Sequence, residues 1–158
     1  MRPFHRLTFS LLAMFGLALC GRVQAVEKIE PDPKGVKLCT DFMAALAIED
    51  EAKRLEAVIP LLHKTLLTED GKDLTPDVKR FSYRKACTDA KLYKQPAQVT
   101  EVHKGTEHTA GFGKQAEKGR ADKYFVAKKD DVPGRPAPLH VFWPSDGGAP
   151  KLISIGSL

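Results

Sequence analysis

Apolar residues recur at intervals of three and four residues in the first half of the chain, which is the spacing of one face of an α-helix. The first stripe follows Asp32-Pro33, where Asp can cap a helix and Pro fits its first turn. The second contains Pro60, so a helix starts or kinks there. The third begins after Thr75-Pro76-Asp77 and ends before Gln95-Pro96. The apolar positions are Val36, Cys39, Phe42, Met43 and Leu46 in the first stripe, Leu55, Val58, Ile59, Leu62 and Leu66 in the second, and Val78, Phe81, Ala86, Cys87 and Ala90 in the third.

After residue 96 the pattern changes to short runs rich in β-branched and aromatic residues, which is typical of strands. We predict four strands, at residues 98–105, 122–129, 139–143 and 152–156. The longest predicted loop covers residues 106–121. Because the connections are too short for crossover helices, the strands are expected to pair antiparallel. Three helices followed by such a sheet predict an α+β domain.

The first 25 residues have the pattern of a secretory signal peptide. Arg2 and Arg6 give a positive start, and a mostly apolar run follows at residues 7–20. Small residues then occupy the positions that a signal peptidase reads, so we predict cleavage between Ala25 and Val26. The mature protein is therefore expected to be extracytoplasmic, either periplasmic or secreted.

Two alternatives to free secretion stay open. Residues 17–20 resemble a lipobox that ends in a lipid-modified Cys20, although Leu19 stands where that motif has a small residue. An uncleaved anchor is the second alternative, but the apolar run is shorter than the roughly 20 residues that a membrane-spanning helix needs. Under the main prediction, an N-terminal arm at residues 26–35 leads into a single domain at residues 36–158.

The signal peptide also changes how the charge of the chain is interpreted. The whole sequence has a formal net charge of +5. Arg2, Arg6 and Arg22 lie in the predicted signal peptide without any acidic residue, so removing them leaves a charge of +2. A charge this small gives no electrostatic case for binding nucleic acid. Membrane contact is expected only if Cys20 is lipidated.

Two cysteines, Cys39 and Cys87, remain in the mature chain. In an oxidising compartment an even pair favours a disulfide, which would stabilise the fold by about 4 kcal/mol in the chain-entropy model. The alternative is two reduced thiols buried on helix faces, because Cys packs as a small apolar residue. Neither cysteine lies in a local motif that lowers the pKa of a thiol, so we predict no catalytic thiol.

Three segments resemble parts of a known fold family: an opening helix at residues 41–46, the segment at 58–63, and a closing hairpin made by 139–143 and 152–156. In this order they resemble the nuclear-transport-factor-2-like superfamily, the cystatin-like α+β roll that includes polyketide-cyclase-like and ketosteroid-isomerase-like proteins. The resemblance implies three N-terminal helices packed on a curved four-stranded antiparallel sheet, often around an apolar pocket. Members usually insert a short strand before the third helix, which only residues 66–68 could supply here.

Aromatic residues of these elements are the candidates for lining such a pocket. Neighbouring aromatics on a strand point to opposite faces, so one set packs under the helices and the other is left for a pocket or an oligomer surface. The expected pocket-lining residues are Phe81, Tyr83, Tyr124, His140 and Trp143. Isomerase-like members use an Asp base with Tyr and a protonated acid, but no local motif in this sequence matches that set.

Few residues suggest chemistry by their spacing. Glu101 and His103 share one face of a predicted strand, and Glu107 and His108 follow closely. Zinc sites need three or four converging ligands, so a solvated strand face is the favoured interpretation. His63, on an apolar helical segment, is expected to be half-buried or at the surface. We therefore assign no catalytic, cofactor-binding or metal-binding residue, and no cofactor.

A basic face on the third predicted helix, made by residues 79–85, is either solvated or a docking site for an acidic partner. Because no acid–base motif is present and the sheet is rich in aromatic residues, we predict a non-catalytic domain that binds a small apolar ligand or a protein partner. The alternatives are an isomerase- or cyclase-like enzyme with a pocket carboxylate, and a lipid-anchored structural envelope protein. A homodimer is also left open.

Overall fold

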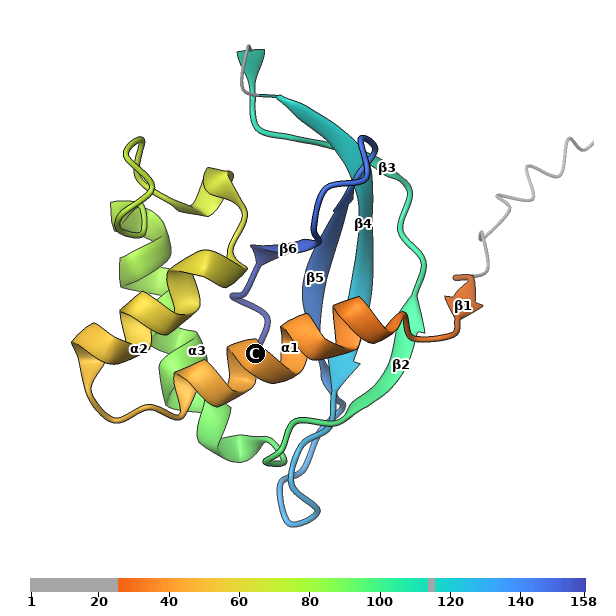
Figure 1. Cartoon of the computed structure of the whole chain (residues 1–158). Coiled ribbons are helices and arrows are strands. Elements are labelled where there is room, and N and C mark those ends of the chain that lie inside the picture. Colours follow the sequence, from red (N-terminus) through yellow and green to blue (C-terminus); the bar gives the residue numbers. More distant parts are fainter. Residues whose placement is uncertain (1–25, 114–115) are drawn as a thin grey trace, which may run out of the picture.

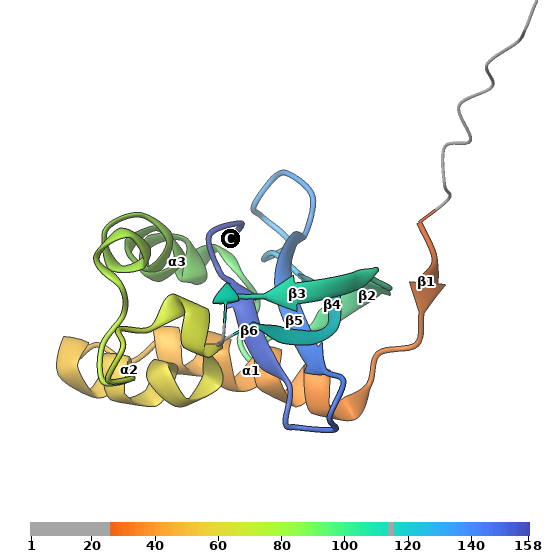
Figure 2. The same ribbon diagram turned by 90° about the horizontal axis from the view of Figure 1, so that it is seen from above.

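The computed structural model describes residues 26–113 and 116–158 (Figures 1 and 2). The predicted signal peptide, Cys20 and Ala25 lie outside the described residues. Inside them, none of the helices combines the length and apolar character needed to cross a membrane. The α+β class is confirmed: helices occupy one side of the molecule and an antiparallel sheet the other.

The first helix, α1 (Pro33–Leu46), starts where the sequence predicts it. The carboxylate of Asp32 accepts a hydrogen bond from the backbone N–H of Lys34 at 2.8 Å, and Pro33 occupies the first turn. Gly35 lies directly against the sheet, since a Cβ at this position would overlap the side chain of Tyr124. The absence of a side chain at residue 35 therefore lets α1 pack closely on the strands.

The second predicted stripe is divided into several elements. Helix α2 (Glu51–Val58) begins after Asp50, whose carboxylate accepts a backbone N–H at 2.8 Å. Pro60 lies in the 3₁₀ turn η1 (Ile59–Leu61), so the proline ends this helix rather than starting one. The chain then pairs with the sheet at Leu62, and a second 3₁₀ turn, η2 (Lys64–Leu66), follows.

The third helical segment begins at Pro76, directly after Thr75, as the start signal predicts. The pattern predicts one regular helix here, but the backbone is divided into three helical forms. It is π-helical in η3 (Val78–Tyr83), α-helical in α3 (Arg84–Asp89) and 3₁₀ in η4 (Ala90–Leu92). The expectation of three regular helices is therefore too simple.

Within the described residues the sheet has six strands, so the predicted number of four is wrong. The strands pair antiparallel in the order β1-β2-β4-β5-β6, and β3 pairs with β4. The strands are β1 (Lys28–Ile29), β2 (Val99–His103), β3 (Glu107–Ala110), β4 (Glu117–Val126), β5 (Ala137–Pro144) and β6 (Lys151–Ser154).

The two additional strands come from segments with no regular hydrophobic pattern. β1 lies in the stretch predicted as an N-terminal arm, and it precedes α1, so the helices do not come before all the strands. β3 and the first part of β4 come from the predicted loop at residues 106–121, where His108 pairs with Gly119. Mostly polar residues fill this hairpin, so its pairing is decided by tertiary contacts and not by periodicity.

The core lies between the helices and one face of the sheet. Tyr124, Leu139 and Val141 are fully buried there against Phe42 and Met43 of α1. All five belong to one continuous cluster of buried residues. The space in which the resemblance implies an apolar pocket is therefore occupied by side chains.

One charged group is fully buried at the edge of this core. The Asp122 carboxylate binds the Arg120 guanidinium with both oxygens, with three N–O distances of 2.9 to 3.1 Å. It also accepts the backbone N–H of Gly105 at 2.8 Å. These hydrogen bonds compensate for burying the charge, so Asp122 acts in holding β4 to the segment after β2.

The two cysteines of the described residues are free thiols, and the predicted disulfide is not formed in the structure. Cys39 is fully buried in the core, and burial raises the pKa of its thiol to about 12. Cys87 is half-buried beside Tyr83, and desolvation also raises the pKa of this thiol. The two side chains thus pack against different surroundings, as small apolar residues.

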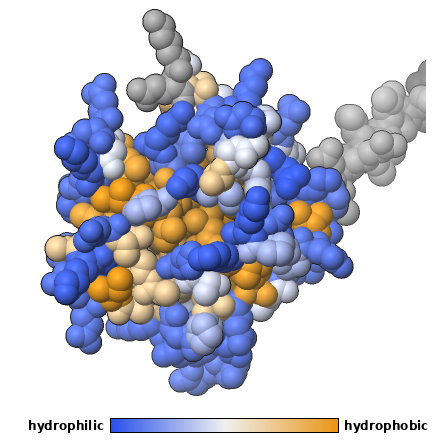
Figure 3. All heavy atoms as spheres, in the orientation of Figure 1, coloured by the Kyte–Doolittle hydropathy of each residue, from blue (hydrophilic) through white to orange (hydrophobic). Residues whose placement is uncertain are grey.

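Few large hydrophobic side chains of the described residues are highly exposed. In Figure 3, apolar atoms appear between polar side chains across the middle of the face that α1 and α2 occupy in Figure 1. Among the described residues, the large hydrophobic side chains with high exposure are Val26 at 61%, Phe81 at 60% and Phe112 at 93%. The apolar colour in Figure 3 therefore comes mainly from partly buried residues that pack on the core.

Candidate functional site

A cavity of about 960 Å³ lies between the segment after α2 and the end of the sheet that carries β3. Residues 64–71 form one wall, residues 108–112 the opposite wall, and His140, Ile153 and Ser154 contribute from β5 and β6. Both walls lie at the same end of the molecule, opposite the β4–β5 loop (Figure 1). We call this cavity the groove.

The groove lies on the face of the sheet that points away from α1. Residues alternate between faces along a strand, so His140 faces away from the core that its neighbours Leu139 and Val141 fill. On β6 the same alternation separates Leu152, in the core, from Ile153, in the groove. The hollow is therefore on the opposite side of the sheet from the pocket that the resemblance implies.

Phe142 is buried beneath the histidines of this face. It is fully buried but does not belong to the main core cluster. Its ring meets the His63 ring at a centroid distance of 5.1 Å and the His108 ring at 6.1 Å, both edge-on. Gly119 makes room for it, because a Cβ there would overlap the Phe142 ring. Phe142 therefore forms an apolar base on which two histidines are positioned.

The sheet edge brings His63 to this face. Leu62 forms a parallel bridge with Leu152, and the backbone N–H of His63 donates to the Leu152 carbonyl at 2.8 Å. The His63 side chain is only 3% exposed. The pairing continues the sheet beyond β6 and leads the chain from the helices to the groove.

Hydrogen bonds fix the tautomer of His63. The backbone N–H of Thr65, which can only donate, lies 3.3 Å from His63 Nδ1, and the Thr65 hydroxyl lies 2.9 Å from the same atom. Nδ1 is therefore an acceptor, and Nε2 carries the proton toward Glu117 Oε2 at 3.3 Å. His63 thus joins the turn at η2 to the first residue of β4.

The charges around His63 compensate one another. Burial lowers the pKa of His63, and the nearby Glu117 opposes this effect only in part. Lys64 Nζ lies 3.0 Å from Glu117 Oε2 and holds the pKa of Glu117 below its ordinary value. The carboxylate of Glu117 is therefore already balanced by a lysine and a hydrogen-bonded histidine.

His108 and His140 differ from His63 because no hydrogen bond joins either ring to another of the described residues. His140 is half-buried and His108 is exposed, and both line the groove. Burial, then Lys123 and His108, lower the pKa of His140. The groove therefore contains two imidazoles with unused hydrogen-bonding capacity.

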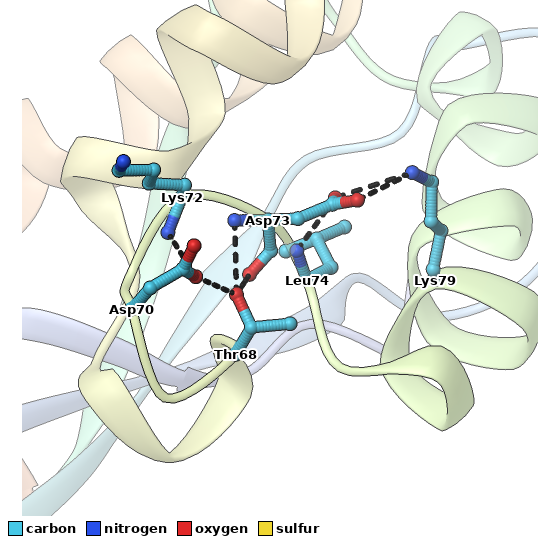
Figure 4. A network of polar contacts seen from close by, with 6 residues as sticks. All are labelled: Thr68, Asp70, Lys72, Asp73, Leu74 and Lys79. Atoms are coloured by element: carbon cyan, nitrogen blue, oxygen red, sulfur yellow. Dashed lines mark hydrogen bonds and ion pairs between the residues drawn. The ribbon is translucent and has the colours of Figure 1, made fainter.

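The wall at residues 67–74 is held by its own hydrogen bonds (Figure 4). Leu67 and Leu74 form an antiparallel bridge that closes the loop. Inside it, Thr68 Oγ1 lies 2.7 Å from Asp70 Oδ1 and accepts the backbone N–H of Asp73 at 3.1 Å. The loop that forms this side of the groove is therefore held in shape by contacts among its own residues.

Two acidic residues of that wall, Asp70 and Asp73, are held by hydrogen bonds and an ion pair, whereas Glu69 lines the groove. The Asp73 carboxylate accepts the Leu74 N–H at 2.7 Å and pairs with Lys79 at 2.9 Å, which holds the pKa of Asp73 below its ordinary value. The hydrogen bonds from Thr68 and from a backbone N–H likewise lower the pKa of Asp70. Neither carboxylate lines the groove.

Of the five residues expected to line a pocket, His140 alone lines the groove. Tyr124 is fully buried in the core, Tyr83 is buried beside the helices, and Trp143 packs half-buried against the core. Phe81 is exposed on η3. Three of the four aromatics that were expected at a pocket, Tyr83, Tyr124 and Trp143, thus pack in or against the core instead.

The residues weighed as metal ligands do not converge. His103 Nε2 lies 3.1 Å from Glu101, and its ring packs on Phe125 with a centroid distance of 4.5 Å. His108 contacts Phe142 instead. Across residues 26–113 and 116–158, no three His, Cys, Asp or Glu side chains are arranged to hold a metal ion.

Sequence reasoning missed the arrangement of His63, Thr65 and Glu117. The His-x-Thr spacing is local and visible, but it is too common to indicate a site. The partner Glu117 is 54 residues away and becomes a neighbour only through strand pairing. His108 and His140 are likewise brought to one groove by the tertiary fold.

Comparisons of this chain with protein families, with curated proteins and with solved structures find no match. The class is therefore defined by the fold itself: an α+β protein whose six-stranded antiparallel sheet carries a histidine-lined groove on its outer face. Membership of the nuclear-transport-factor-2-like superfamily stays a prediction.

Proposed function

We propose that this chain is a non-catalytic, extracytoplasmic domain that binds a small ligand in the groove. The observation that carries the proposal is the lining of a cavity of about 960 Å³. Apolar side chains such as Leu67 and Ile153 share it with two histidines, His108 and His140, that hydrogen-bond no other described residue. Ligand sites combine apolar walls with a few polar groups in this way.

The charges near the groove favour binding over the alternative of an isomerase- or cyclase-like enzyme. Such an enzyme needs a pocket carboxyl with a raised pKa. The pKa of Glu117, the carboxylate that His63 contacts, is lowered by Lys64. This group therefore lacks the environment of a general base that abstracts a proton near neutral pH.

The predicted signal peptide supports the extracytoplasmic part of the proposal. The intact mass of the denatured protein from its natural host tests it. A chain that begins at Val26 is expected. A lipid on Cys20 would instead indicate the anchored form, and an uncleaved N-terminus would contradict export with cleavage.

Native mass spectrometry tests the ligand. We expect mass beyond the polypeptide that is lost on denaturation, and a variant that fills the groove should not retain it. Ser154→Trp places an indole in the groove from β6, while Ser145→Trp places one in the exposed turn after β5. The proposal predicts ligand loss in Ser154→Trp alone, with circular dichroism unchanged in both. Retention of the ligand by Ser154→Trp would contradict it.

A further inference from the structure

We infer that the ligand of the groove carries a carboxylate, bound by the rings of His108 and His140, and an apolar part that packs on Leu67 and Ile153. This inference rests on the proposed function and names the chemical class of the ligand. The sequence predicts a small apolar ligand or a protein partner, and the inference replaces this with an amphipathic acid.

The first step is the hydrogen-bonding capacity of the groove. His108 and His140 make no hydrogen bond to another described residue, and the hydroxyl group of Ser154 also lines the cavity. A wholly apolar ligand would remove these groups from water without replacing their hydrogen bonds, which is unfavourable. A ligand with an oxygen acceptor at this position satisfies them.

The second step is the balance of charge. Lys64 and the two histidines are the basic groups that line the groove, and Lys123 faces the same side of the sheet as His140. Among the acids, Glu117 is compensated by Lys64 and His63, and Glu69 lines the groove with a solvent-exposed side chain. Because water screens Glu69, while Lys123 and the two histidines have no acidic partner among the described residues, an anionic group is preferred to a cationic one.

The third step selects a carboxylate over a strongly charged anion. The lining contains Leu67, Ala110, Phe112 and Ile153, so a large part of the ligand contacts carbon. The basic groups that line the groove are two imidazoles and one lysine, which is already paired with Glu117. A singly charged planar group with an apolar chain fits this lining, and each oxygen can accept one imidazole N–H.

The same geometry makes binding depend on pH. Lys123, His108, His63 and Lys64 surround His140 with positive or titratable groups, against Glu69 and Glu117 on the acidic side. Burial, then Lys123 and His108, lower the pKa of His140, so its ring is neutral in the empty groove near neutral pH. A bound carboxylate favours the protonated ring, and uptake of one proton raises the affinity by up to about tenfold per unit of pH decrease.

Three matched probes test the head group: octanoate, octan-1-ol and octylammonium, with affinities measured by calorimetry at about pH 5.5 and about pH 7.5. Octanoate is expected to bind at least about tenfold more tightly than the alcohol, because it gains charge-assisted hydrogen bonds. Octylammonium is expected to bind most weakly, and the octanoate affinity is expected to rise at the lower pH.

The outcomes separate this inference from the proposed function. Equal binding of all three probes would overturn the carboxylate and leave a ligand-binding groove. Octanoate binding that does not change with pH would overturn the role of the histidines. If no probe binds while the native protein retains a ligand, the proposed function stands and the inference on ligand class fails.

Variants sharpen the test. His140→Gln and His108→Gln each should weaken octanoate binding by about tenfold and reduce its pH dependence, while the affinity for octan-1-ol stays the same. His103→Gln is the matched control, since His103 lies on β2 outside the groove. A loss of alcohol binding in the groove variants would show a general change of shape and contradict the assigned role.

Discussion

The two faces of the sheet are covered in different ways. On one face, α1 lies across the strands, and Tyr124, Leu139 and Val141 are fully buried beneath the helical layer. On the other face, a short irregular segment and the β3–β4 hairpin leave a cavity of about 960 Å³ that His108 and His140 line. The same strands thus supply a packed core on one side and a site with unused polar groups on the other.

The difference shows how one kind of contact serves two purposes. On each face a glycine makes room for an aromatic ring: Gly35 for Tyr124 in the core, and Gly119 for Phe142 under the groove. In the core, apolar side chains then complete the packing. Beside Phe142 the neighbours are His63, which is bonded to Thr65 and Glu117, and His108, whose ring can hydrogen-bond a ligand.

The largest expected effect comes from removing a core side chain. Phe42→Ala deletes a fully buried ring on α1 and should lower the free energy of unfolding by about 3–5 kcal/mol in urea titrations. Phe112→Ala, at a side chain that is 93% exposed, is the matched control and should change stability by less than about 0.5 kcal/mol. Similar decreases in the free energy of unfolding for both variants would contradict the difference between a packed core and an open groove.

Alanine at each of the two glycines sharpens the comparison. Gly35→Ala overlaps the Tyr124 side chain, and Gly119→Ala overlaps both the Phe142 ring and the Trp143 carbonyl. Each should cost about 1–3 kcal/mol of stability. Adding Tyr124→Leu should recover most of the cost at Gly35, whereas a side-chain change at Phe142 should not rescue Gly119→Ala, because a backbone atom is in the way. Full recovery of stability at both sites would show that only side-chain overlap, and not the backbone contact, causes the loss, and would contradict the prediction.

A smaller effect is expected from pH. The pKa of His63 and of His140 is lowered by burial, so between that lowered value and the ordinary value of about 6.5 the unfolded chain binds more protons. The contribution of these residues to stability is therefore present above about pH 6.5 and is lost as the pH falls through that window. Urea midpoints measured across it should vary less in His63→Gln and in His140→Gln than in the unmodified protein. An unchanged slope in both variants would contradict this assignment.

The smallest effect concerns the thiols, whose reaction need not change stability. Cys39, in the core, should react with a thiol reagent more slowly than half-buried Cys87 in the native protein. In denaturant without reductant, both should react. A denatured protein with no reactive thiol at either position would show that the disulfide predicted from the sequence forms after all.

The fold class and the start of α1 could be predicted because the signals are local. Asp32 and Pro33 act within the first turn of that helix, and the apolar positions of α1 follow its period. The short β1 strand could not be predicted in this way. Lys28 and Ile29 belong to the sheet because β2 offers a free edge and because Glu27 pairs with Lys104 at 3.0 Å, and neither partner is near in sequence.

The candidate site was less accessible to sequence reasoning than the fold. His63 and His140 were each recognised as single residues, but the groove depends on the bridge between Leu62 and Leu152 and on the β3–β4 hairpin. Two of the aromatic residues expected at a pocket, Tyr83 and Tyr124, are in the core because their size favours burial. Which face of the sheet carries a cavity depends on tertiary contacts of the covering segments, and these are not visible in the local sequence.

The hydrogen-bonded loop that forms one wall of the groove affects how the sequence can diverge during evolution. Because Leu67, Thr68 and Asp73 hold the loop together through their own bonds, the shape of the wall does not depend on the exposed residue Glu69. Substitutions at such a position change the side chain that a ligand contacts, without destabilising the loop. In homologous chains, we therefore expect Glu69 to vary and to change ligand selectivity, while Leu67, Thr68 and Asp73 stay the same.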